Sequence, residues 1–352
     1  MSDINRRALL VAVIAASGAR WVAPAFAQQS EPSPPAGPPA AAPFGYDEVV
    51  KRARELAAAP FEAQTPQLPD GLARLDFDAW RDIRFRPDKA LLGESGGPFR
   101  LQLFHLGHLY QRPVIVNVLR DGTPAPVPYA ANLFDYGRNK FDASLPINLG
   151  FAGFRLHYPL NSPLIMDEVI AFLGASYYRF LGRGQRYGLS ARGLGVNSGI
   201  GQNEEFPFFR EFWIDAPGAG AQRAIIHALL DGQSVTGAFR LEIYPGQETT
   251  IEITATIFAR RDIAILDMAP LSSMFLLGKN DHRLADDFRN ELHDSDGLLI
   301  HNGGGEWIWR PLSNPSEAAL STFLDKDIRG FGLLQRDRNF EHYQDLDLAY
   351  EL

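Results

Sequence analysis

Short segments that alternate apolar and polar side chains recur along this chain, and turn residues close each of them. Phe99–Leu106 places Phe99, Leu101 and Leu103 on one side, and Val114–Leu119 is rich in β-branched residues. A repeat of two residues is that of a strand with one buried face. With 32 glycines and 25 prolines between such segments, the pattern predicts a mainly β chain, folded as a large antiparallel β-sandwich.

Two further segments strengthen the strand prediction. Phe239–Tyr244 and Thr250–Ile257 both alternate, and the turn-forming run Pro245–Glu248 separates them. This spacing predicts a β-hairpin. Trp307–Arg310 is another candidate strand, in which Trp307 and the tryptophan two residues later share one face.

Only two helices are expected. Asp47–Leu56 has apolar residues at helical spacing. Pro163–Leu173 is preceded by Ser162, which places a capping residue before a proline in the first helical turn.

The N-terminus has the three parts of an export signal. Arg6 and Arg7 precede an apolar run over residues 8–16, and Ala25-Phe26-Ala27 provides small residues before a cleavage site. We expect residues 1–27 to be a signal peptide that directs the chain to the periplasm, and the arginine pair indicates the twin-arginine route. The apolar run is too short to cross a bilayer. Residues 28–43 read as a Pro/Ala-rich tether.

Composition narrows the classes of function. The formal net charge of −8 disfavours nucleic acid as a partner. The absence of cysteine excludes disulfides, thiolate metal sites and a cysteine nucleophile. The glycine pairs at residues 182–184 and 193–195 do not fit a dinucleotide loop, and no G-x-S-x-G run is present. We therefore expect no cofactor and no metal.

The segment His293-Asp294-Ser295-Asp296-Gly297 is the strongest chemical candidate in the sequence. Clustered carboxylates raise one another's pKa, which suits acid and base work on a glycosidic bond. Aspartate and glycine are also common turn residues, so a purely structural turn fits the same residues. Trp307 allows two readings as well, because an exposed tryptophan is a platform for a sugar ring and a buried one belongs to the core.

Several long runs resemble the periplasmic glucan biosynthesis proteins of the G/D type, which serve osmoregulated periplasmic glucans. The resemblance extends from about Phe44 to Leu352. The runs that carry it are LGFAGFRLHYPLN (149–161), FLGASYYR (172–179), YGLSARGLGVNSG (187–199), EEFPFFREFWID (204–215), APLSSMFLLG (269–278), ELHDSDGL (291–298), GEWIWRPL (305–312) and GFGLLQRDR (330–338).

The resemblance implies a fold, an activity and a site. The fold is a large, galactose-mutarotase-like β-sandwich followed by an immunoglobulin-like domain. The family includes inverting endo-β-1,2-glucanases, and its general base maps onto Asp294. Asp296 is expected to cap the turn before Gly297. We expect the glucan to be bound by aromatic and arginine side chains in or beside the family-like runs, namely Tyr178, Arg179, Arg192, Trp307 and Arg310.

The sequence also departs from the family pattern. Gly304 and Asn339 replace an Asn and an Asp that are usual in the family, and the chain ends at Leu352, where family members continue. Residues 44–352 are therefore expected to form a shortened sandwich without the immunoglobulin-like domain and without the general acid. Two functions remain open: a β-1,2-glucanase, and a protein that holds glucan for an inner-membrane glucosyltransferase without cutting it. The G and D branches are not separated, although the arginine pair favours D.

Overall fold

The computed structural model describes residues 43–63, 68–141, 145–199, 203–282 and 286–345. The account below concerns these residues. The expected signal peptide and residues 28–42 of the expected tether lie outside the described residues.

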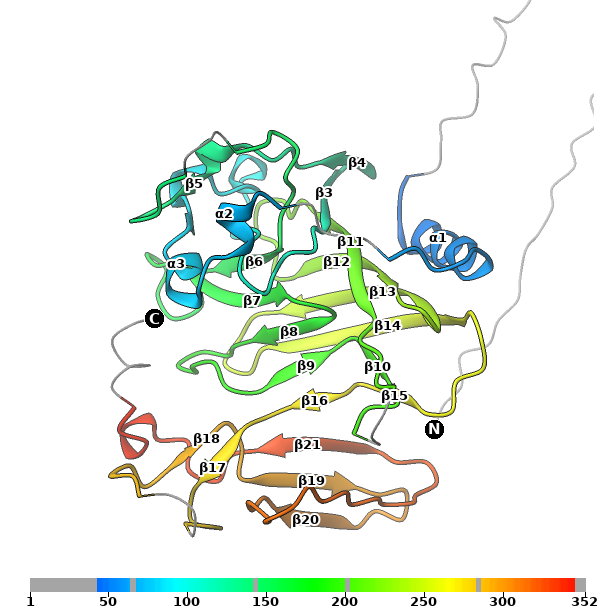
Figure 1. Ribbon diagram of the computed structural model, residues 1–352, viewed down its shortest axis with the longest axis vertical. Helices are drawn as coiled ribbons and strands as arrows, with labels where there is room; N and C mark the ends of the chain where they lie inside the picture. Colours follow the sequence, from blue (N-terminus) through cyan, green and yellow to red (C-terminus); the bar gives the residue numbers. More distant parts are fainter. Residues whose placement is uncertain (1–42, 64–67, 142–144, 200–202, 283–285, 346–352) are drawn as a thin grey trace, which may run out of the picture. The chain divides into compact units, whose positions relative to one another are not determined.

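Two six-stranded sheets make up most of the fold (Figure 1). The β12 sheet has the order β14 (Thr250–Ala259), β13 (Val235–Tyr244), β12 (Ala224–Asp231), β11 (Phe208–Asp215), β3 (Ile115–Arg120) and β4 (Thr123–Pro126). The β6 sheet has the order β16 (Leu271–Ser272), β9 (Ser190–Arg192), β8 (Tyr177–Phe180), β7 (Asp167–Leu173), β6 (Gly153–Tyr158) and β2 (Arg100–Phe104). The pairing between β3 and β11 is parallel. The other neighbouring strands of both sheets are antiparallel.

One hydrophobic core joins the two sheets. Phe154 of β6 stacks on Phe172 of β7 with 5.0 Å between ring centroids, and meets Phe212 of β11 edge-on at 4.9 Å. Because each sheet turns one apolar face to this core, the arrangement is a β-sandwich, as predicted. The predicted strands are confirmed, and the predicted hairpin is β13 and β14, with Tyr244 opposite Thr250.

Smaller elements surround the sandwich. Three short sheets contain β1 (Arg84–Phe85) with β5 (Phe134–Asp135), β10 (Leu194–Val196) with β15 (Leu266–Met268), and β17 (Phe275–Leu277) with β18 (Leu292–His293). A three-stranded sheet has β19 (Gly297–His301) between β20 (Trp307–Pro311) and β21 (Gly330–Leu334). Apart from the N-terminal helix, which is described next, the helices of the described residues are short: α2 (Asp70–Ala73), α3 (Phe77–Arg81) and the 3₁₀ turns Pro87–Lys89, Gly93–Ser95, Ala131–Leu133 and Phe340–His342.

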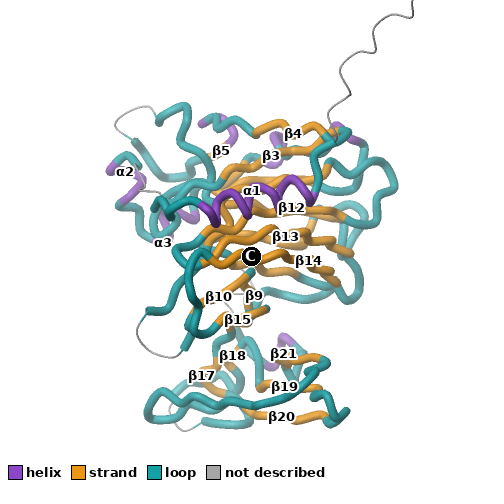
Figure 2. Tube along the Cα trace, turned by 90° about the vertical axis from the view of Figure 1, so that its right-hand side faces the viewer, coloured by secondary structure: helices purple, strands orange, loops and turns teal. Residues whose placement is uncertain are grey.

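The predicted N-terminal helix is confirmed as α1 (Tyr46–Ala58), which packs along β12, β13 and β14 (Figure 2). Val49 and Ala53 are its buried residues. The Thr236 hydroxyl on β13 donates a 2.7 Å hydrogen bond to the Ala53 carbonyl, so a polar contact fixes the helix on the sheet as well as an apolar one.

Replacing Thr236 by valine tests this contact. The change keeps the shape of the side chain and removes this donor, so that the Ala53 carbonyl keeps only its bonding within α1. We expect the free energy of unfolding to fall by about 0.5–1.5 kcal/mol in urea titrations. Thr254→Val, on the exposed edge strand β14, is the matched control and should change it by about 0.5 kcal/mol or less. Equal effects in the two variants would contradict the role of the bond.

The predicted helix over Pro163–Leu173 is wrong. A single turn follows Ser162, because the amide of Ile165 donates to the Ser162 carbonyl, and then β7 begins at Asp167. Asp167 accepts hydrogen bonds from the amides of Leu160 and Asn161, which closes the connection from β6. Since β7 pairs with both β6 and β8, sheet pairing outweighs the local helix-start signal.

Within the part of the chain that the structure describes, no helix has the length and apolar character needed to cross a membrane.

Candidate functional site

Asp294 lines a cavity of about 580 Å³, called here the Asp294 cavity. Its walls come from four stretches of chain: β8 with the loop that leads to β9, the residue before β17, β18 with Asp294, and the end of β21 with the segment that follows it. The lining residues are Tyr178–Phe180, Gly184–Leu189, Ala191, Met274, Leu292–Asp294, Leu333–Gln335, Arg338, Phe340, Tyr343 and Asp345.

The backbone of Met274, which directly precedes β17, holds Asp294 in place. Asp294 follows β18, which pairs with β17. Its amide donates to the Met274 carbonyl at 2.7 Å, and its Oδ2 accepts from the Met274 amide at 3.0 Å. These two hydrogen bonds to Met274 fix both the backbone and the carboxylate of Asp294. Because they use only Oδ2 of the carboxylate, the second oxygen, Oδ1, keeps its capacity to accept a proton.

Burial raises the pKa of Asp294 above its ordinary value of 3.8. The Met274 hydrogen bond and the nearby guanidinium of Arg179 oppose this shift. Arg179 lies on the same cavity wall and is itself fixed, because its Nε donates to the Ser190 hydroxyl at 2.8 Å. A half-buried carboxylate with a raised pKa is the environment in which general bases are found.

The raised pKa has a consequence for stability. Because the folded state binds this proton more tightly than the unfolded state, ionising Asp294 weakens the fold as pH rises through and above the ordinary value of 3.8. Asp294→Asn keeps an oxygen that can accept from Met274 and removes the ionisation. We expect its melting temperature to match that of the wild type at about pH 3 and to exceed it at pH 7.

Asp287→Asn is the control of opposite sign for these melting curves. In the wild type, hydrogen bonds from Arg289 lower the pKa of the Asp287 carboxylate to about 2. Ionised Asp287 therefore supports the fold at pH 7, and this support is lost as pH falls through about 2. The variant should melt below the wild type at pH 7, with the difference shrinking in acid. A pH-independent difference for Asp294→Asn would contradict the raised pKa.

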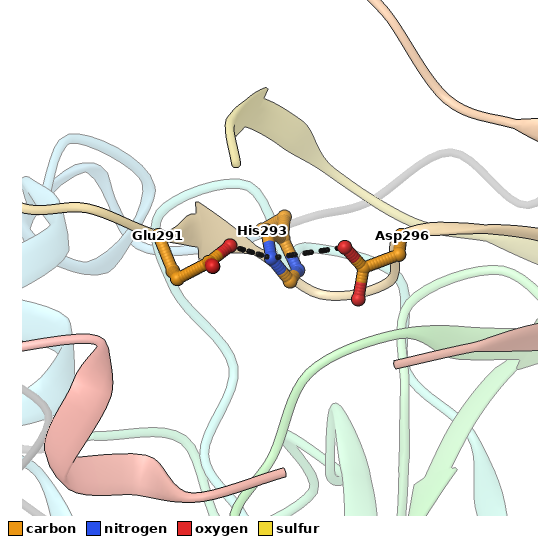
Figure 3. Close-up of side chains that lie close together, drawn as sticks. All are labelled: Glu291, His293 and Asp296. Atoms are coloured by element: carbon orange, nitrogen blue, oxygen red, sulfur yellow. Dashed lines mark hydrogen bonds and ion pairs between the residues drawn. The ribbon is translucent and has the colours of Figure 1, made fainter. Parts of the chain in front are cut away.

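Glu291, His293 and Asp296 form a buried cluster on the chain on either side of Asp294, and Figure 3 shows these three side chains. His293 Nε2 is 2.8 Å from Glu291 Oε2 and 3.6 Å from Asp296 Oδ1. The three side chains offer ligand atoms within 4.8 Å of one another, so their number and type would suit a divalent cation. Each carboxylate already has a cationic neighbour, with Lys279 3.8 Å from Glu291 and Arg336 3.6 Å from Asp296. A charge network that positions the Asp294 segment explains these contacts without a metal.

The expected role of Asp296 as a cap for its own turn is wrong. Its Oδ2 accepts from the backbone amide of Arg336 at 2.7 Å, and its own amide donates to the Leu334 carbonyl. Asp296 is buried and joins the Asp294 segment to the chain that follows β21. Its function is therefore a long-range structural contact.

The five predicted glucan-contact residues lie in different places. Tyr178 and Arg179 line the Asp294 cavity. Tyr178 is otherwise a core residue that stacks on Phe172, and burial raises its pKa to about 12. The other three are described below.

Arg192, Trp307 and Arg310 are not among the described walls of this cavity. Arg192 lies over the rings of Tyr177 and Phe206, at 5.4 Å from each centroid. Trp307 is 61% exposed and stacks flat on His301 at 4.2 Å, and Arg310 lies over the Phe323 ring. The exposure of Trp307 removes the core interpretation of this residue and leaves its outer face open.

A second cavity of about 1090 Å³, called here the His157 cavity, adjoins the first. Gly184, Gln185, Arg186 and Tyr187 line both, so the loop between β8 and β9 is their common wall. The Tyr187 hydroxyl donates to Glu168 Oε1, and Arg186 packs over the Phe340 ring at 4.5 Å. These two contacts fix the shared loop from both sides.

Sequence reasoning did not single out the polar residues of the second cavity. Arg155, His157 and Glu168 line it and come from the neighbouring strands β6 and β7. The sequence does contain a pattern for two of them, because Arg155 and His157 alternate with the apolar, buried residues Phe154 and Leu156. Alternation identifies the outward face of a strand, and only the fold shows that this face borders a cavity.

Comparison with known proteins adds to this geometry. The family model of the periplasmic glucan biosynthesis protein MdoG matches residues 44–352. A glucans biosynthesis protein G from Ralstonia nicotianae is 47% identical over 313 residues, which cover 89% of this chain and 62% of the relative. Its counterpart from Rhodopseudomonas palustris is 48% identical over 306 residues, covering 86% of this chain and 60% of the relative. The chain thus spans roughly three fifths of the length of these curated relatives.

Proposed function

This chain belongs to the family of periplasmic glucan biosynthesis proteins, and we propose that it binds a β-1,2-linked glucan and cleaves its backbone with Asp294 as general base. The observation that carries the proposal is the placement of one anchored carboxylate of raised pKa on a cavity walled by arginines and aromatic rings. Aromatic faces hold sugar rings, and fixed polar groups orient their hydroxyls.

The chemistry needs a base that is ionised and held still. Asp294 Oδ1 would take a proton from the attacking water, directly or through intervening groups, while Met274 retains Oδ2. Inversion at the anomeric carbon uses two carboxyl groups, of which Asp294 would be the base. Arg179, fixed by Ser190 on the same wall, would bind glucan hydroxyls and limit the rise of the Asp294 pKa.

The predicted contact residues enter the proposal in two groups. Tyr178 and Arg179 would meet the sugar inside the Asp294 cavity. Arg192, Trp307 and Arg310 would meet it only where a long glucan continues across the surface, with the exposed face of Trp307 as a stacking platform.

The combined size of the two cavities supports a second function, in which the protein holds a glucan without cutting it. The two cavities together reach far beyond Asp294, and such a surface holds a glucan whether or not it is cut. In that role the protein would receive glucan from an inner-membrane glucosyltransferase. Family membership implies the periplasm. Export by a signal peptide over residues 1–27, through the twin-arginine route, is part of the proposal.

Incubation with linear β-1,2-glucan separates the two functions. Since inversion needs a second carboxyl group as well as Asp294, the assay uses the protein at the full length of its curated relatives, and there we expect new reducing ends to form, with the α-anomer appearing first in NMR spectra because inversion converts a β-linkage. Linear β-1,3-glucan is the control substrate and should stay intact. Binding of β-1,2-glucan without new reducing ends would favour the holding function and contradict cleavage.

A further inference from the structure

Two polar atoms in the wall of the His157 cavity have no hydrogen-bond partner among the described residues. They are Nε2 of His157 and Nε of Arg155, and both are buried. Buried polar groups are nearly always paired, so each such atom calls for an explanation. The two residues are two apart on β6, and both line the same cavity.

The hydrogen bonds that His157 and Arg155 already make show which of their polar atoms have no partner. His157 Nδ1 lies 3.1 Å from the Met166 carbonyl, which only accepts, so Nδ1 carries the proton. Burial lowers the pKa of His157, which keeps the ring neutral and makes Nε2 an acceptor. Arg155 donates from Nη1 to Glu168 and from Nη2 to Gln102. Its Nε–H has no partner among the described residues and is a donor held in a fixed position.

Two residues of the cavity wall, two apart on one strand, therefore carry one acceptor and one donor without a partner among the described residues. A hydroxyl group both donates and accepts, and a sugar carries several of them on one ring. A carboxylate would pair with Arg155 and not with the neutral imidazole, and a metal cation would bind the imidazole Nε2 but be repelled by the Arg155 guanidinium. From these contacts we propose that the His157 cavity is a second subsite for a neutral sugar, with His157 Nε2 accepting from one hydroxyl and Arg155 Nε donating to another.

This subsite rests on the proposed function and extends it, because the shared wall connects it to the Asp294 cavity. Trp80, Phe85 and Phe104 give it apolar walls, which suit the faces of a pyranose ring. Its contacts would be made by the part of the glucan remote from Asp294. His157 would then set the preference for long chains over short ones.

A pair of substitutions at His157 isolates the Nε2 atom. Asparagine reproduces the position of Nδ1 and can still donate to Met166, but it has nothing at Nε2. Glutamine reaches the position of Nε2 and can accept there. We would titrate both variants calorimetrically in the Asp294→Asn background, so that the sugar is not cut, with short and long linear β-1,2-glucan oligomers. Melting curves verify that both variants are folded.

The expected result is selective. His157→Asn should bind the long oligomer about 3- to 10-fold more weakly than its parent. His157→Gln should stay within about 2-fold, and neither change should affect an oligomer too short to leave the Asp294 cavity. Inorganic phosphate should not displace the long oligomer.

Other outcomes overturn the subsite or the function separately. If His157→Asn binds the long oligomer as its parent does, the subsite is wrong and the proposed function stands. Equal weakening for short and long oligomers also contradicts a remote subsite. Displacement by phosphate would show that the cavity takes an anion. If neither the parent nor the wild type binds any oligomer, the proposed function itself fails.

Discussion

In the protein at the full length of its curated relatives, Asp294→Asn is expected to lower the rate of β-1,2-glucan cleavage by about 10²- to 10⁴-fold or more and to leave glucan affinity unchanged. Asparagine keeps the shape of the side chain and an oxygen for the Met274 amide, but it does not take a proton from water. Rates from reducing-end assays and dissociation constants from calorimetry, measured on the same preparation, test both halves of this expectation.

Asp296→Asn is the matched control, since it lies two residues away and makes the same chemical change. Asp296 is buried, accepts a hydrogen bond from the Arg336 amide and lies beside the Arg336 guanidinium. The variant should therefore lose about 1–3 kcal/mol of unfolding free energy. Its cleavage should fall only in proportion to the folded fraction. Normal cleavage by Asp294→Asn would remove the assigned role. Joint loss of cleavage, binding and thermal stability in that variant would make Asp294 a structural residue.

Asp231→Ala is expected to lower the free energy of unfolding by about 3–5 kcal/mol. Asp231 is 2% exposed at the end of β12, and it pairs with Arg210 at 2.7 Å and with Arg260 at 3.0 Å. The side chain of Arg260 is also buried and donates to the Leu56 carbonyl at the end of α1. Removing the carboxylate leaves a buried guanidinium without its counter-charge and loosens the attachment of α1. Urea titration measures the loss.

The exposed pair of Asp70 and Arg74 is the control for this effect. Its atoms are 3.2 Å apart, close to the buried distances, and both side chains are largely exposed. Solvent screening reduces such pairs to small contributions, so Asp70→Ala should cost about 1 kcal/mol or less. A loss for Asp231→Ala no larger than that for Asp70→Ala would show that the pairs of Asp231 do not stabilise the fold.

The alternation of apolar and polar residues along the chain was sufficient to predict many of the strands. The period of two residues identified β2, β3, β13, β14 and β20, because each of these strands carries its own pairing signal in alternation or β-branching. The same reasoning failed at Pro163–Leu173, where a capping serine and a proline start one turn and no helix follows. The competing contacts come from β6 and β8, and a window of ten residues contains no information about them.

The site was less accessible to sequence reasoning than the fold. The residues alone allowed Asp294 to be a turn former, and the resemblance to a known family selected it. Asp296 was assigned a local role because its partner, Arg336, is 40 residues away in the chain. Arg155 and His157 passed unnoticed, since a polar residue on the outer face of a strand is ordinary until a cavity is known to border it.

The stretches that wall the Asp294 cavity are far apart in the chain, with Tyr178 and Tyr343 separated by 165 positions. Contacts over such separations close large loops and form late in folding. Strands and hairpins can therefore be complete while the cavity does not yet exist. A refolding chain should regain its far-ultraviolet circular dichroism before it regains the capacity to bind glucan, which makes the sugar a probe for the last step of assembly.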